Sequence, residues 1–62
     1  WNNAARAFFE MAVRMDPSDA DSVFNWVELA PPNSSDRDVA VSLDGMGVER
    51  DLREKAIEAR KG

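Results

Sequence analysis

Pro17 constrains the fold of this chain most, because it separates two segments that each repeat apolar residues with helical spacing. Proline lacks a backbone N–H and fixes φ, so it cannot continue a helix. The residue before a proline is also biased away from helical angles. The first half of the chain therefore predicts two helices, at residues 3–15 and 19–30, joined by a turn at residues 16–18. A connection this short makes the helices antiparallel neighbours.

The first predicted helix has one charged stripe and is otherwise almost entirely apolar. Arg6, Glu10 and Arg14 recur at every fourth position, a spacing that allows two ion pairs along the helix. Such pairs are worth about 0.2–0.5 kcal/mol each, whereas burying a Phe side chain is worth about 1.5–3 kcal/mol. Packing is therefore expected to fix this helix, which should be buried on most sides.

The second predicted helix is amphipathic. Ser18 and Asp21 have a spacing like that of a capping box, which predicts that Ser18 caps the start of the helix. The apolar residues of the segment are Val23, Phe24, Trp26, Val27 and Ala30. The polar residues gather on the opposite side, so one side of this helix is expected to face the first helix.

Pro31 and Pro32 end the second helix and open a polar linker over residues 31–47. Part of this linker alternates apolar with small or polar residues, as a strand does. The alternating apolar residues are Val39, Val41 and Leu43. The following Asp-Gly pair fits a hairpin turn, although a lone two-stranded hairpin is barely stable in water.

The same linker also fits a short helix. Val39, Leu43 and Met46 share one helical face. Ser35 and Asp38 supply an N-cap before this face, and a glycine after it fits a helix C-terminus. We therefore favour a short helix or an irregular turn in this segment over a strand.

Residues 48–61 predict a third amphipathic helix with a narrow apolar stripe. The stripe consists of Val48, Leu52, Ala56 and Ala59, with Ile57 beside it. Glu49 and Arg53 are spaced for an ion pair, and Arg60 and Lys61 suit the negative end of the helix dipole. Because most of its surface is polar, this helix is expected to be peripheral and largely solvated.

The composition excludes several classes of chemistry. The 62 residues include no Cys and no His, so disulfides, thiolate or imidazole metal sites and nucleophilic pairs with His are impossible. We predict no cofactor, no metal and no enzymatic activity. Twelve acidic against eight basic residues give a net charge of −4, which disfavours direct binding of nucleic acid. Every apolar run is shorter than a membrane span.

Three closely spaced carboxylates, those of Asp16, Asp19 and Asp21, invite comparison with a calcium loop. The EF-hand loop requires a glycine at its sixth position and a glutamate at its twelfth, and neither condition is met here. Helix capping explains these residues better. The carboxylates of Glu49, Asp51, Glu54 and Glu58 are interpreted as a solvated helix face.

Ala5, Phe9, Ala12 and Pro17 have the spacing of the second helix of a tetratricopeptide (TPR) repeat, which the segment resembles. The related half-a-TPR (HAT) repeat is also similar. Its motifs resemble Ala5-Arg6, Phe9-Glu10 and Trp26-Val27-Glu28, although Val23 stands where that family usually has Trp. The resemblance covers residues 4–30 and implies a helical-repeat fold.

Helical repeats normally need at least three units for stability, so one and a half repeats imply a fragment or a terminal unit. The chain also begins at Trp1 without an initiator Met, as a fragment or a processed product would. A chain of this size buries only about 60% of its unfolded surface. Without disulfides or a metal, a partner is the remaining route to added stability.

We therefore predict an all-α chain with a TPR/HAT-like antiparallel helical hairpin at residues 1–30, a linker at 31–47 and a C-terminal amphipathic helix at 48–62. Short helices cannot enclose every aromatic residue, and exposed aromatic and Met side chains mark interfaces. The predicted interface residues are Phe8, Phe9, Met11, Phe24 and Trp26. The predicted function is non-catalytic: a scaffold or peripheral subunit that binds other protein chains in a larger hetero-complex. The alternative is a HAT-like fragment of an RNA-processing factor.

Overall fold

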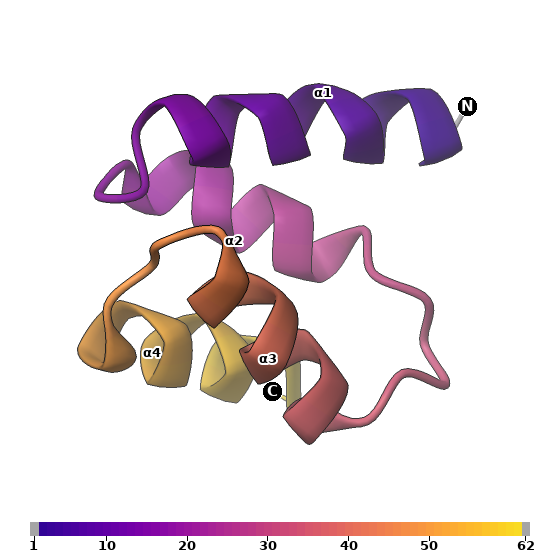
Figure 1. The fold of residues 1–62 in the computed structure, drawn as a ribbon. Coiled ribbons are helices and arrows are strands. Elements are labelled where there is room, and N and C mark those ends of the chain that lie inside the picture. Colours follow the sequence, from indigo (N-terminus) through magenta and orange to yellow (C-terminus); the bar gives the residue numbers. More distant parts are fainter. Residues whose placement is uncertain (1, 62) are drawn as a thin grey trace.

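Four α-helices form the part of the chain that the computed structural model describes, residues 2–61 (Figure 1). They are α1 (Asn2–Met15), α2 (Ala20–Glu28), α3 (Asp36–Gly45) and α4 (Arg50–Lys61). Residues 2–61 contain no strand, which confirms the predicted all-α class. None of the four described helices is long and apolar enough to cross a membrane.

The helices pack in pairs, and α4 holds the two halves of the chain together. α1 and α2 run antiparallel as a hairpin, as predicted, and α4 packs against both α2 and α3 (Figure 1). The prediction that the C-terminal helix is largely solvated is confirmed, since Ala56 is its one buried residue. Its contacts with two other helices give it a larger role in the packing than a peripheral helix would have. Ala56, near the middle of α4, is 1% exposed, because its small side chain allows the neighbouring helix to approach closely.

One hydrophobic core draws side chains from all four helices and from the turn between α3 and α4. Its buried members are Val13, Val23, Trp26, Val27, Ala30, Val39, Leu43, Met46, Val48 and Ala56. Phe9, Leu52 and Ile57 are partly buried against it. The hairpin, the predicted linker and the C-terminal helix thus share a single core.

The start of α2 differs from the predicted capping box. Ser18 donates from its backbone N and its Oγ to Asp16 Oδ1, at 3.2 and 2.6 Å, and forms no cap. Asp19 is the N-cap residue, but its side chain accepts no backbone N–H of the helix and instead accepts from Ser22 Oγ at 2.9 Å. The Ser18 hydroxyl donates to Asp16 within the local turn around the proline, and local side-chain hydrogen bonds of this kind compete with helix capping. α2 accordingly begins at Ala20, one residue later than predicted.

The short-helix alternative for the linker is confirmed by α3. Ser35 is its N-cap, and its Oγ accepts from the Asp38 backbone N at 3.1 Å. Val39 and Leu43 are buried, whereas Val41, which a strand pattern grouped with them, is 64% exposed. The apolar residues therefore follow the helical period and not the period of a strand.

The C-terminus of α3 is closed by a Schellman motif. Gly47 has a φ of 89°, in the left-handed region that glycine enters without steric cost. The Val48 N donates to the Leu43 O, and the Gly47 N donates to the Asp44 O, both at 3.0 Å. These are the two hydrogen bonds that define the motif. Leu43 and Val48 are both buried in the core, so the turn directs the chain into α4.

Arg53 holds the same turn from the side of α4. Its Nη1 donates to the Val48 O at 2.8 Å and to Asp44 Oδ1 at 3.1 Å. The predicted partner of Arg53 was Glu49, four residues earlier, but the described ion pairs join Arg53 to Asp44 instead. The long-range partner is reached because the turn brings α3 against α4.

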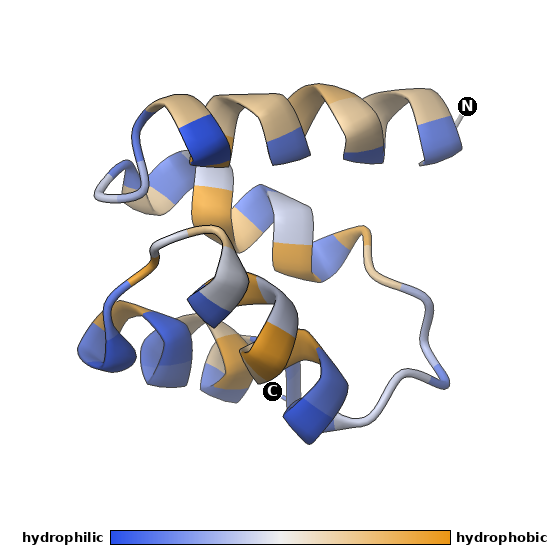
Figure 2. Cartoon of the chain, in the orientation of Figure 1, coloured by the Kyte–Doolittle hydropathy of each residue, from blue (hydrophilic) through white to orange (hydrophobic). Residues whose placement is uncertain are grey.

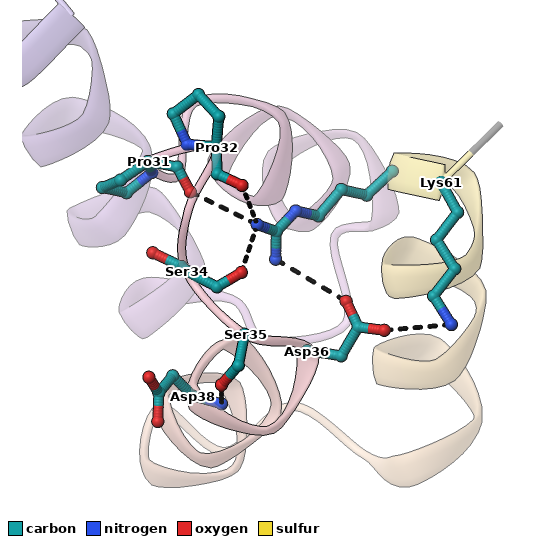
Figure 3. A network of polar contacts seen from close by, with 8 residues as sticks. Pro31, Pro32, Ser34, Ser35, Asp36, Asp38 and Lys61 are labelled. Carbon is teal, nitrogen blue, oxygen red and sulfur yellow. Dashed lines mark hydrogen bonds and ion pairs between the residues drawn. The ribbon is translucent and has the colours of Figure 1, made fainter.

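Arg60 closes the other end of α4 onto the loop after α2. Its Nη2 donates to the backbone O of Pro31, Pro32 and Ser34, at 3.2, 3.4 and 2.6 Å. Its Nη1 lies 3.8 Å from Asp36 Oδ1, an ion pair without a hydrogen bond. Figure 3 shows the carbonyl groups of these three loop residues converging toward one guanidinium group.

Lys61 completes this network. Its Nζ lies 2.9 Å from Asp36 Oδ2 (Figure 3). The hydrogen bond to Asp36 raises the pKa of Lys61 above its ordinary value, and the negative charges of Asp36 and Glu58 add to this effect. Arg60 and Lys61 were predicted to interact favourably with the negative end of the helix dipole. In the structure both also form ion pairs with Asp36, at the start of α3.

Candidate functional site

The five predicted interface residues divide into exposed and buried positions. Phe8 and Met11 on α1 are 67% and 65% exposed, and Phe24 on α2 is 37% exposed. Phe9 is half-buried against the core. Trp26 is only 2% exposed, so its assignment to an interface is wrong and it belongs to the core.

Trp26 is buried because the loop and α3 fold back over the α1–α2 pair. Together with Arg6, Ala30 and Val39 it lines a small open pocket of about 100 Å³. The Arg6 Cζ lies 5.3 Å from the centre of the Trp26 ring, within the range of a cation–π contact. Arg6 was predicted to pair with Glu10. The structure places it on the indole ring instead.

The second predicted pair on α1 does form, since Arg14 Nε lies 3.6 Å from Glu10 Oε2. Both side chains are substantially exposed, at 58% for Arg14 and 43% for Glu10. Exposed pairs of this kind contribute little to stability, so this pair does not determine how α1 is held.

The outward side of α1 carries a continuous apolar stripe. Phe8, Met11 and Met15 follow each other at i, i+3 and i+7, and they are 67%, 65% and 84% exposed. The α1 stripe consists of Ala4, Ala7, Phe8, Met11 and Met15, all of them exposed. Val13, on the opposite side of the helix, is fully buried. α1 therefore has two apolar sides, and only one of them faces the core. Figure 2 shows apolar residues along the whole length of α1, interrupted by hydrophilic ones.

Met15 is the most exposed member of the stripe and was absent from the predicted interface. A signal for it was present, because Met15 lies four residues after Met11 and seven after Phe8, on one face of a helix. Met15 belongs to the first predicted helix, at residues 3–15, but it was not included in the predicted interface.

The exposed Phe8 ring contacts the ring of its neighbour in α1, Phe9. The two rings meet edge to face, with the centroids 5.3 Å apart and the planes at 81°. Edge-to-face contacts of this kind are favoured by the ring quadrupoles. Because Phe9 is itself packed against the core, it gives the exposed Phe8 ring a fixed neighbour.

Next to the last residue of the stripe lies a concentration of carboxylates. The α1–α2 turn and the α3–α4 turn lie at the same end of the molecule (Figure 1). Between them is an open cleft of about 460 Å³ lined by Asp16, Glu49 and Asp51, with Lys55 as its one basic residue. We name the acidic end by its exposed residues Asp16, Asp19, Asp21, Glu49 and Asp51. None of these five takes part in the described ion pairs.

The acidic end does not have the arrangement of a metal site. Within residues 2–61, no three His, Cys, Asp or Glu side chains are grouped so that they could hold a metal ion. Asp16 and Asp19 already accept hydrogen bonds from the hydroxyl groups of Ser18 and Ser22. The carboxylates therefore act as separate surface charges.

Phe24 lies away from the α1 stripe, in a groove between α2 and α4. The groove has a volume of about 350 Å³ and is lined by Phe24, Val27, Glu28, Ala56, Ala59 and Arg60. The structure thus separates Phe24 from Phe8 and Met11, with which it was grouped in the prediction. The candidate site contains Phe8 and Met11, together with Met15.

No family model, curated protein or solved structure matches this chain. The resemblance to TPR and HAT repeats in residues 4–30 stays a prediction.

Proposed function

We propose that this chain is a non-catalytic protein–protein interaction module that docks onto another protein through the α1 stripe. The observation that carries this proposal is the exposure of Phe8, Met11 and Met15 on one side of α1, while the other side of the same helix packs into the core. Exposed aromatic and Met side chains are enriched at the centres of protein interfaces.

The size of the stripe supports this function. A large apolar side chain presents about 200 Å² when fully exposed. With the exposed fractions of Phe8, Met11 and Met15, the stripe offers roughly 400 Å² of apolar surface. The largest apolar patch of a typical monomer covers about 300–600 Å² and is often functional. Here such a patch lies on a chain of only 62 residues.

The role that follows is a scaffold or peripheral subunit, as the sequence predicts. The surface charges of the chain give less support to the alternative role in RNA processing. Arg53, Arg60 and Lys61 pair with Asp44 and Asp36, which weakens their attraction to a phosphate backbone. The net charge of −4 acts in the same direction.

Site-specific photocrosslinking in the producing cell tests the proposal. A photoreactive phenylalanine analogue replaces Phe8 in one variant, Met11 in a second and the exposed Arg37 on α3 in a control. We expect a discrete crosslinked protein from positions 8 and 11 and none from position 37. No product at positions 8 and 11, or the same products from all three positions, contradicts the docking function.

A further inference from the structure

The charge of this chain is distributed unevenly around the α1 stripe. α1 contains Arg6, Glu10 and Arg14 and has a net charge of +1, so the net charge of −4 leaves −5 for the rest of the chain. Met15, the most exposed residue of the stripe, is followed directly by Asp16. The stripe therefore joins the acidic end without a polar gap.

We propose that the α1 stripe and the acidic end together bind a cationic amphipathic helix of a different protein. This inference rests on the proposed docking function and specifies the partner. The apolar face of the partner helix lies along Phe8, Met11 and Met15, and its Lys or Arg residues lie over Asp16 and Asp21.

A helix fits the shape of the stripe. α1 has 14 residues, which corresponds to about 21 Å at 1.5 Å per residue, and its exposed apolar residues follow one line along this length. Ala4 and Ala7 are exposed within that line, and small residues allow two helix backbones to approach closely. The flexible side chains of Met11 and Met15 adapt to the shape of an apolar partner.

A second copy of this chain is a poorer occupant. Two α1 stripes facing each other would bury roughly 800 Å² in total, which is below the range of about 1,200–2,000 Å² for stable complexes. Each copy also has a net charge of −4, so two copies repel each other. A cationic helix gains attraction from the acidic end, which raises its association rate and makes binding dependent on salt.

Two synthetic peptides of about 20 residues, long enough to form a helix, test the identity of the partner. They share the same leucine face and differ in having lysine or glutamate at every polar position. Each is titrated against the purified chain by fluorescence anisotropy, at low and at high salt. We expect the lysine peptide to bind at least about tenfold more tightly than the glutamate peptide, with a preference that falls as salt screens the charges.

Two pairs of variants locate the binding. M11Q/M15Q removes the apolar anchors and is expected to weaken binding of the lysine peptide at least about tenfold. D16N/D21N is expected to reduce the preference for lysine over glutamate. E28Q/E54Q is the control, because it removes the same number of negative charges elsewhere on the surface. This variant is expected to retain most of the preference for the lysine peptide.

Several outcomes overturn the inference: equal binding of the two peptides, no binding, unchanged binding by M11Q/M15Q, or an equal loss of preference in D16N/D21N and E28Q/E54Q. Sedimentation that shows a dimer formed through the stripe also overturns it. Crosslinks at positions 8 and 11 without peptide discrimination would leave the docking function standing and remove the cationic helix. An absence of crosslinks together with peptide discrimination would instead count against the docking function in the cell.

Discussion

Arg60 joins the end of α4 to a loop that lies 26 to 29 residues earlier in the chain. One guanidinium nitrogen satisfies three backbone carbonyls of a segment that contains two prolines. Prolines cannot donate backbone hydrogen bonds. Within the loop the Ser34 N donates to the Pro31 O at 2.9 Å, and Arg60 supplies a donor to the carbonyls of Pro32 and Ser34. The side chain of Arg60 is 14% exposed, and its shortest hydrogen bond, to the Ser34 O at 2.6 Å, is partly buried.

Arg60→Met is expected to destabilise the chain by about 1.5–3 kcal/mol, because hydrogen bonds from a charged group to the loop carbonyls are lost. Arg50→Met, at the exposed start of the same helix, is expected to change stability by less than about 0.5 kcal/mol. Urea unfolding monitored by circular dichroism measures both. Equal effects of the two substitutions would contradict the role assigned to Arg60.

Lys61 makes stability depend on pH at the alkaline end. Its pKa is raised above the ordinary value of 10.5 by Asp36, so its contribution is fully present below the unfolded pKa and is lost as pH rises through the folded pKa. Thermal melts from about pH 9 to about pH 11.5 should show this loss in the native chain and in Lys55→Met. Lys61→Met should show a smaller loss. An identical pH profile for the native chain and Lys61→Met would refute the coupling.

Trp26 shows the limit of predicting from sequence whether one side chain is buried or exposed. An aromatic residue at helical spacing is equally compatible with a core and with an interface. The decision depends on whether another element covers it, and the loop and α3 do so from a distance in sequence. Phe8 has the same chemistry, but within the described residues no element covers it, and it is 67% exposed.

Both ends of α3 follow local rules, although part of its sequence also fits a strand pattern. Its start has a Ser35 cap, and its end has a glycine in the left-handed region followed by a buried valine. The Ser35 cap and a glycine at the helix C-terminus were both part of the short-helix alternative. The capping box expected at α2 failed because the nearby proline turn competed for the same hydroxyl group.

The two glycines at the end of α3 provide a matched test. Gly47→Ala is expected to destabilise the chain by about 1–2 kcal/mol, because its φ of 89° places an added Cβ in strain. Gly45→Ala is expected to stabilise it by about 0.5–1 kcal/mol, since Gly45 is helical and an added Cβ meets nothing within 4 Å. Urea midpoints that moved in the same direction for both variants would contradict the Schellman motif.

The shared core makes the molecule one cooperative unit. Leu43 is fully buried on α3, in the segment expected to be a linker, and the core around it includes residues from α1, α2 and α4. A domain of this length has a total stability of only about 3–9 kcal/mol. A substitution that creates one large cavity in the core therefore removes a considerable part of this stability.

Leu43→Ala is expected to cost about 2–5 kcal/mol and to lower the unfolding midpoint of all four helices together. Val41→Ala, on the exposed side of the same helix, is expected to change stability by less than about 0.5 kcal/mol. Both variants are made in a Trp1→Phe background, so that Trp26 is the remaining tryptophan. Circular dichroism follows the helices and fluorescence follows Trp26 during the same urea titration. If the two signals separated in Leu43→Ala, α3 would not belong to the same cooperative unit as the hairpin.

The sequence alone determined the helices, because their periods, caps and breakers act over a few neighbouring residues: Pro17 divides α1 from α2, and Ser35 and Gly47 bound α3. It also indicated that apolar surface would be left over. Only the tertiary structure decided which apolar residues are covered. Burial depends on contacts between helices that are distant in the chain, so Trp26 entered the core while Met15 stayed outside. The same contacts brought α4 against α2 and moved Arg53 and Arg60 to partners that no local spacing indicates.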